Sequence, residues 1–237
     1  MKIANTLTAI LFFSTSFLCL QAQDKPFTVE IRGGANFTKM HSDYEVDGKP
    51  GYRIDVVVDR SLSSDIFLRS GLTFSAKNSD FGVRGFGDFN GDGYYDYFEF
   101  VAEVRARYLQ LPLMLGYKHK FKNVSLNGAF GSYFSYGIAG NSHSLLILAS
   151  TDIPVDGQDF NSLTEGQIST INVSGYDSKV FKDVYKRFDS GLSVSIGAQF
   201  KRFTLSAGYE FGLLNFGRDG DNIKNRTISV SLGYRIF

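Results

Sequence analysis

The 237-residue sequence is poor in cysteine, proline and histidine, and it contains no tryptophan. Its single cysteine, Cys19, lies near the N-terminus, so the rest of the chain can form no disulfide. Lys and Arg total 25 against 24 Asp and Glu, and this balance leaves no basic excess for nucleic acid, so we expect no nucleic-acid partner. After the N-terminal segment, the sequence contains no run of about 18 apolar residues, which excludes a transmembrane helix there.

The N-terminal segment has the pattern of a secretory signal peptide. Lys2 supplies the positive charge, residues 10–20 form the apolar centre, and Leu20-Gln21-Ala22 fits a cleavage site. We therefore expect residues 1–22 to be a signal peptide and residues 23–237 to form one domain. Cleavage would also remove Cys19 and Lys2, which leaves 24 basic and 24 acidic residues in the mature chain.

The last residues, 226–237, alternate between apolar and polar side chains. They read R-T-I-S-V-S-L-G-Y-R-I-F, with Ile228, Val230 and Leu232 on one side of the pattern. Alternation with a period of two predicts a β-strand with one apolar face and one polar face. In an exported chain that ends on an aromatic residue, this pattern favours a strand whose apolar face meets lipid.

Seven earlier segments alternate in the same way, and each is close to the length that a tilted strand needs to cross a bilayer. The eight predicted strands are residues 27–36, 52–59, 66–77, 109–118, 124–138, 192–200, 203–213 and 226–237.

The links between these segments strictly alternate between short and long. The short links are residues 60–65, 119–123 and 201–202, and the long links are residues 38–50, 78–103, 140–187 and 215–225. Outer-membrane barrels have short periplasmic turns and long extracellular loops. The sequence therefore predicts an all-β fold: an eight-stranded antiparallel up-and-down transmembrane β-barrel with long extracellular loops, located in the cell outer membrane and surrounded by its lipid.

One irregularity precedes the fourth predicted strand. Apolar residues occupy even positions from Phe98 to Val104 and odd positions from Leu109 onward. Either a β-bulge near residues 105–108 or an extension of the strand above the membrane would explain the change.

The polar face of the predicted strands carries charges of both signs. An eight-stranded barrel has an interior that side chains can fill, and an unpaired charge there is costly, so we expect these charges to pair. Mixed signs also argue against an ion-selective ring, although a narrow pore lined by these charges is an alternative. The charged residues concerned are Glu30, Asp55, Asp59, Glu210, Arg32, Arg53, Arg69, Lys77, Lys118 and Arg235.

The second long link contains a D-x-N-x-D-G-x5-E pattern that is typical of calcium-binding loops. Carboxylate, amide and backbone oxygens at this spacing are the ligands that Ca²⁺ prefers. The same residue types are also common in loops that bind no metal. The predicted ligands are Asp88, Asn90, Asp92, Tyr94 through its carbonyl, Asp96 and Glu99.

The third long link contains an apolar run, Leu145 to Ala149, outside the predicted membrane span. This run either extends the fifth strand or packs back on the barrel rim, or it contacts a partner protein. His143 lies between Ser142 and Ser144 in the same link, but adjacent residues do not show the arrangement of nucleophile, base and acid that hydrolysis needs. We find no other catalytic motif and predict that the protein is not an enzyme.

The segment L-Q-L-P-L-M-L-G-Y-K at residues 109–118 and the terminal G-Y-R-I-F resemble the PorT-like outer-membrane β-barrel family of Bacteroidetes. Ile236 departs from the Tyr-Arg-Phe ending that is more usual in that family and shifts Phe237 out of phase with Tyr234. The resemblance covers nearly the whole mature chain and implies no catalytic residues.

Three functional hypotheses follow. The resemblance implies an accessory or structural subunit of a larger outer-membrane complex, such as PorT-type secretion machinery. The alternatives are a stand-alone surface barrel that binds ligand or calcium through its loops, and a small pore.

Overall fold

The computed structural model describes residues 27–41, 46–88, 91–154, 168–217 and 223–237. The predicted signal peptide lies outside these residues. The strands are β1 (Phe27–His41), β2 (Val46–Ser61), β3 (Ile66–Gly87), β4 (Tyr94–Lys120), β5 (Val124–Pro154), β6 (Ile168–Lys179), β7 (Phe188–Phe200), β8 (Phe203–Gly212) and β9 (Lys224–Arg235).

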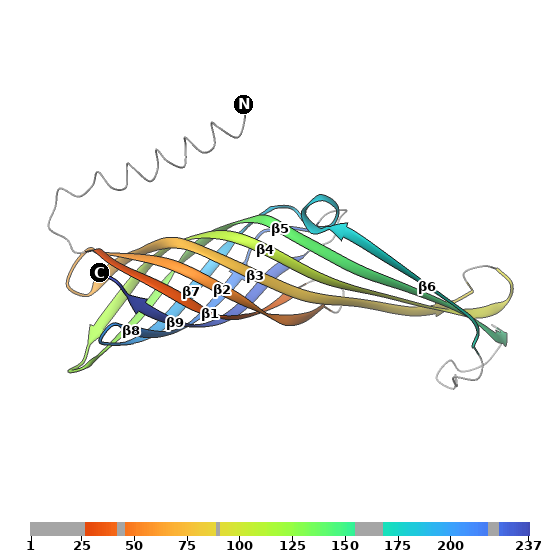
Figure 1. Ribbon diagram of the computed structural model, residues 1–237, viewed down its shortest axis with the longest axis horizontal. Helices are drawn as coiled ribbons and strands as arrows, with labels where there is room; N and C mark the ends of the chain where they lie inside the picture. Colours follow the sequence, from red (N-terminus) through yellow and green to blue (C-terminus); the bar gives the residue numbers. More distant parts are fainter. Residues whose placement is uncertain (1–26, 42–45, 89–90, 155–167, 218–222) are drawn as a thin grey trace, which may run out of the picture.

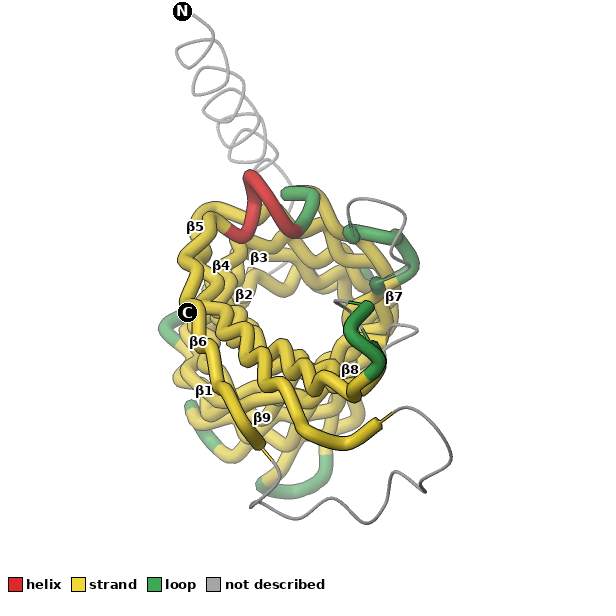
Figure 2. The backbone as a smooth tube through the Cα atoms, turned by 90° about the vertical axis from the view of Figure 1, so that its right-hand side faces the viewer, coloured by secondary structure: helices red, strands yellow, loops and turns green. Residues whose placement is uncertain are grey.

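Eight of these strands close into a ring of antiparallel pairs, as Figures 1 and 2 show. The ring runs from β1 through β2, β3, β4, β5, β7 and β8 to β9, and β9 pairs with β1 again, for example through Ala35 and Val230. Each of the eight segments predicted from alternation lies on one of these strands. The predicted eight-stranded up-and-down barrel is therefore confirmed. Among the described residues, no helix is both long and apolar enough to cross a membrane.

Apolar side chains cover the outside of the barrel and polar side chains fill its inside. On β9, the side chains of Ile228 and Leu232 are 56% and 60% exposed. Thr227, on the opposite face of the same strand, is 1% exposed. This arrangement inverts that of a soluble protein, because lipid rather than water surrounds the outer surface.

The pairing of β3 with β4 has a gap of two residues next to a proline. Ser70 pairs with Leu113 and Thr73 pairs with Gln110, and no pairs connect the residues between them. Pro112 of β4 has no N–H to donate. Gly71 of β3 has φ +151°, a backbone conformation that residues with a side chain rarely adopt. The glycine therefore allows β3 to depart from regular geometry where the proline cannot bond, which explains how a proline lies within a central strand.

Above the barrel, β3, β4 and β5 continue and β6 pairs with the upper part of β5. We call this four-stranded projection the arm; it comprises residues 78–87, 94–107, 139–154 and 168–179. Figure 1 shows it extending along the long axis of the molecule. Residues 78–103 and 140–187 were expected to be loops, but much of both segments is strand. For residues 98–104 and for Leu145 to Ala149, strand extension was one of the explanations that the sequence allowed, and it is confirmed. The rest of the pairing depends on register, which alternation alone does not reveal.

The arm also explains the change of phase near residues 105–108. Ala102, Val104, Ala106, Tyr108 and Gln110 of β4 are all buried, so even-numbered side chains point inward on both sides of the change of phase. No bulge interrupts β4 against β3; the register shift lies on β5, where Arg107 pairs with Ala139 and Tyr108 with Gly137. The sequence allowed either a β-bulge in this strand or an extension of the strand above the membrane, and the extension is what β4 shows. The apolar face changes sides because the surroundings of the strand change from lipid to water.

Candidate functional site

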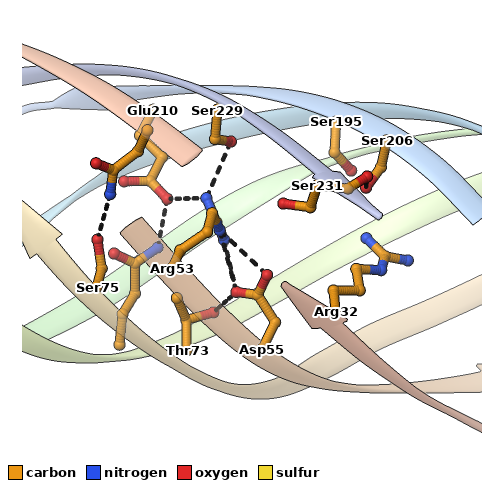
Figure 3. Close-up of polar contacts among 12 residues, drawn as sticks. Arg32, Arg53, Asp55, Thr73, Ser75, Ser195, Ser206, Glu210, Ser229 and Ser231 are labelled. Carbon is orange, nitrogen blue, oxygen red and sulfur yellow. Dashed lines mark hydrogen bonds and ion pairs between the residues drawn. The ribbon is translucent and has the colours of Figure 1, made fainter. Parts of the chain in front are cut away.

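The centre of the barrel holds a network of buried charges around Glu210 of β8. Its Oε2 accepts a hydrogen bond from Lys77 Nζ at 3.1 Å, and its Oε1 accepts one from Gln110 Nε2 at 2.7 Å. Arg53 Nη1 lies 3.4 Å from the same carboxylate and donates to Ser229 Oγ at 3.0 Å. Figure 3 shows Glu210 and Arg53 at the middle of these contacts. Lys77 is fully buried, so its charge depends on Glu210 for compensation.

Further ion pairs surround this centre. Arg53 pairs with Asp55 at 2.8 Å, and Thr73 donates to the same Asp55 carboxylate at 2.6 Å. Arg69 binds Asp59 through two nitrogens, at 2.8 and 2.9 Å.

Towards the end of the barrel where β1 begins and β9 ends, Arg32 pairs with Glu30 at 2.9 Å. Arg235 hydrogen-bonds to Gln199, and Lys118 is half-buried near the end of β4. The predicted pairing of interior charges is therefore confirmed for four acidic residues, Glu30, Asp55, Asp59 and Glu210.

The two halves of the barrel wall contribute side chains of different size. Most of the long charged side chains come from β1, β2 and β3, and Arg53 and Arg69 reach across to Ser229 and Ser195. Figure 3 also labels Ser206 and Ser231 on the serine-rich side. Arg69 Nη1, for example, donates to Ser195 Oγ at 3.2 Å. The cavity left between the two halves measures about 60 Å³. The interior is thus largely filled by protein, as the charge pattern predicted.

An apolar plug lies in the barrel towards the arm. We use this name for Val180, Phe181, Tyr185 and Phe216, which lie on a short π-helix, η3 (Val180–Val184), and on the segments beside β7 and β8. Phe216 and Val180 are fully buried. The two segments are joined by a hydrogen bond from the Lys186 backbone N–H to the Phe216 carbonyl at 2.7 Å.

The plug packs against the barrel wall and connects to the charged network. The rings of Tyr108 and Phe181 meet edge to face with centroids 5.3 Å apart, and Tyr185 donates to Met40 Sδ at 3.1 Å. Lys77 Nζ lies 5.5 Å from the ring centroid of Tyr108 and 5.4 Å from that of Tyr133, within the range of cation–π interactions. Sequence reasoning missed the plug. The signal in the sequence was the two apolar pairs Val180-Phe181 and Val184-Tyr185 in the third long link.

The predicted calcium ligands lie at the tip of the arm and on the upper part of β4. The Asp88 carboxylate accepts hydrogen bonds from the backbone N–H groups of Gly91 at 2.7 Å, Asp92 at 3.1 Å and Gly93 at 3.0 Å. Asp92 accepts from the Tyr94 N–H at 2.9 Å. Asn90 lies outside the described residues. These contacts show Asp88 stabilising the turn between β3 and β4.

The remaining predicted ligands are separated by the geometry of the strand. Asp96 and Glu99 are three residues apart on β4, so their side chains point to opposite faces of the arm. Glu99 accepts a hydrogen bond from the Tyr97 hydroxyl at 2.8 Å. Burial, followed by this contact with Glu99, raises the pKa of Tyr97, which keeps the phenol protonated as the donor. Among the described residues, no three His, Cys, Asp or Glu side chains are grouped as a metal site.

The apolar run and the histidine of the third long link both lie on β5. Leu145 to Ala149 pair with β4 on one side and β6 on the other, so the run does extend the fifth strand. His143 Nδ1 lies 2.7 Å from Asp177 Oδ1 on β6. Ser142 and Ser144 point to the opposite face from His143, so they form no catalytic dyad with it.

Comparisons with known proteins agree with this architecture. Residues 21–217 match the family described as "Outer membrane protein beta-barrel domain". No curated protein matches the chain. Among solved structures, Ail of Yersinia pestis is 15% identical, with 88% of this chain and 98% of that chain covered and a TM-score of 0.34. Neisserial surface protein A is 13% identical, with 90% and 98% covered and a TM-score of 0.35. Likenesses at this level carry no argument about function.

Proposed function

Because the chain belongs to the family of outer membrane protein β-barrel domains, we propose that it is a non-enzymatic structural or accessory subunit of a larger outer-membrane assembly, such as PorT-type secretion machinery. The protein resides in the outer membrane, where its apolar outer face contacts lipid. In this location, the protein would bind a larger outer-membrane protein through the arm.

The observation that carries the proposal is the arm with its exposed apolar side chains above a filled barrel. Leu145 and Leu148 lie on opposite faces of the arm and are 39% and 44% exposed, although both belong to a segment outside the lipid. Apolar side chains that face water on a projecting sheet are typical of protein-interaction surfaces. The filled interior and the plug disfavour the alternative of a small pore.

We expect the variant Leu145→Asp with Leu148→Asp to lose its partner. Both positions are partly exposed, so the sheet should still form, whereas a charge at each should weaken a partner contact. The measurement is a pull-down from native membranes in mild detergent, with mass spectrometry to identify and quantify the larger outer-membrane protein that co-purifies. Its yield should fall about tenfold or more, which corresponds to ~1.4 kcal/mol of binding free energy.

A matched control is Leu62→Asp, because Leu62 is 40% exposed and lies in the turn at the end of the barrel opposite the arm. This variant should retain the partner. If the unmodified protein is purified alone, or if the two arm substitutions leave the yield unchanged, the proposal is wrong.

A second candidate function is calcium binding at the tip of the arm, which the spacing of Asp88, Asp92 and Glu99 favours. These carboxylates already accept hydrogen bonds, so Asp88 would have to give up its bonds to the backbone N–H groups in order to coordinate Ca²⁺. We expect isothermal titration with Ca²⁺ to give a dissociation constant of about 1 mM, as for extracellular modules. Asp88→Ala with Glu99→Ala should abolish the heat, whereas Asp65→Ala in the distant β2–β3 turn should not. The absence of heat with the unmodified protein would remove this candidate.

A further inference from the structure

Strand β6 forms an edge of the arm. Its pairing with β5 begins where Asn141 lies opposite Lys179 and ends where Thr151 lies opposite Ile168. It is the last strand of the sheet on that side. Figure 1 shows β6 at the margin of the arm, projecting away from the barrel. Strand β7 pairs with β5 only up to Tyr136, below the arm, so it does not cover β6. Alternate backbone N–H and C=O groups of β6 therefore face outward from the sheet.

Within the described residues, the middle of this edge carries few of the features that normally prevent edge pairing; the register shift against β5 lies near its start, between Ile168 and Thr170. Residues 171–176 read I-N-V-S-G-Y, without a charge or a proline, and Ile171, Val173 and Tyr176 are 59%, 61% and 57% exposed. The other edge of the arm, residues 82–87 of β3, contains three glycines and Arg84, which weaken or protect it. No strand of the described part of the chain pairs with the outer side of β6, so this edge is open to a further strand. Only a polypeptide can continue its backbone hydrogen bonds.

The pattern of side chains on β6 is self-complementary. Ile171 and Val173 lie on the same face of the arm and flank Asn172 symmetrically. When two β6 strands pair antiparallel around Asn172, Ile171 of each strand lies opposite Val173 of the other, which satisfies the requirement of a two-fold interface. Asp177 and Lys179 fall outside the overlap in this register, so no like charges meet. We propose that the β6 edge pairs with the β6 edge of a second copy of this protein.

The geometry of this pairing places the two copies in facing membranes. Antiparallel neighbours within one sheet are related by a two-fold axis perpendicular to the sheet. The arm extends along the long axis of the molecule, so this rotation inverts the direction of the barrel (Figure 1). Two copies joined through β6 therefore point towards each other across the space between two membranes. A single strand pair is only marginally stable in water. Many such pairs between the same two membranes add their binding free energies and hold the membranes together.

The inference is independent of the proposed function. An accessory subunit binds its partner through Leu145 and Leu148 within one membrane, whereas the homotypic contact uses Ile171 and Val173 between membranes. A test with the purified protein and no other protein examines the second contact alone.

The experiment measures the aggregation of phosphatidylcholine vesicles into which the purified protein has been inserted from outside, so that the polar arm stays outside. Turbidity reports aggregation, and heat-modifiable migration in gels reports folding. We expect vesicles with unmodified protein to aggregate. The variant Ile171→Lys with Val173→Lys places like charges opposite each other and should slow aggregation about tenfold or more. Phe86→Lys with Tyr94→Lys is the control, because it adds the same charge at similarly exposed positions near the tip of the arm.

Charge reversal makes the test specific. The variant Ile171→Glu with Val173→Glu should also fail to aggregate alone, yet a mixture of vesicles carrying the lysine variant with vesicles carrying the glutamate variant should aggregate. Vesicles of unmodified protein that stay dispersed would overturn the proposal. An effect of the control as large as that of the β6 variant, or a mixture that stays dispersed, would also overturn it.

Discussion

Glu210→Gln should destabilise the barrel by ~3–5 kcal/mol, the cost of leaving a buried charge without its partner. The glutamine keeps the shape and the hydrogen-bonding capacity of the side chain but removes its negative charge. Lys77, which is fully buried, would then lose its ion-pair partner, and Arg53 would lose one of its two carboxylate partners. The measurement is the free energy of unfolding in urea with the protein in vesicles, with the folded fraction determined from heat-modifiable migration.

A double variant separates the loss of charge balance from the loss of the side chain. Lys77→Met with Glu210→Gln removes both charges and should regain much of the lost stability, because replacing a buried ion pair by neutral groups is often close to neutral. The comparison therefore forms a double-mutant cycle. A Glu210→Gln protein within about 0.5 kcal/mol of the unmodified protein would show that this network does not stabilise the barrel.

Gly71→Val should have the second large effect, a loss of more than ~3 kcal/mol that prevents refolding of most of the protein. Two causes act together. The φ of +151° is a conformation that a β-branched residue rarely adopts, and a Cβ at this position would lie 2.0 Å from the Val56 carbonyl oxygen on β2. Strand β3 would have to move away from β2 at the point where it already departs from Pro112. The yield of heat-modifiable protein after refolding measures this effect.

Gly82→Val is the matched control, because Gly82 lies on the same strand and a Cβ there meets nothing within 4 Å. This variant should refold with nearly the yield of the unmodified protein. The further variant Gly71→Val with Pro112→Ala tests the link between the two residues. If proline alone requires the glycine conformation, the alanine should restore part of the yield; if the contact with Val56 dominates, it should not.

The sequence alone determined the barrel and which side chains of each strand point outward. Alternation such as that of Ile228, Val230 and Leu232 with Thr227, Ser229 and Ser231 is imposed by the difference between lipid and a polar interior, so the sequence records it directly. The alternation of short and long links follows from crossing a membrane back and forth. The pairing of interior charges was also predictable, because an unpaired charge is costly in any register. Which residues pair, such as Lys77 with Glu210 across the barrel, depends on register and was not.

Only the tertiary structure decided what lies above the membrane. Nothing in the long links pointed to β6, whereas strand extension was one of the sequence-based explanations for residues 98–104 and for Leu145 to Ala149. The plug depends on Phe181 and Phe216, which are 35 residues apart and meet only because two segments enter the same barrel end. Long-range contacts of this kind leave no local pattern. The exposed β6 edge is likewise visible only once the neighbours of each strand are known.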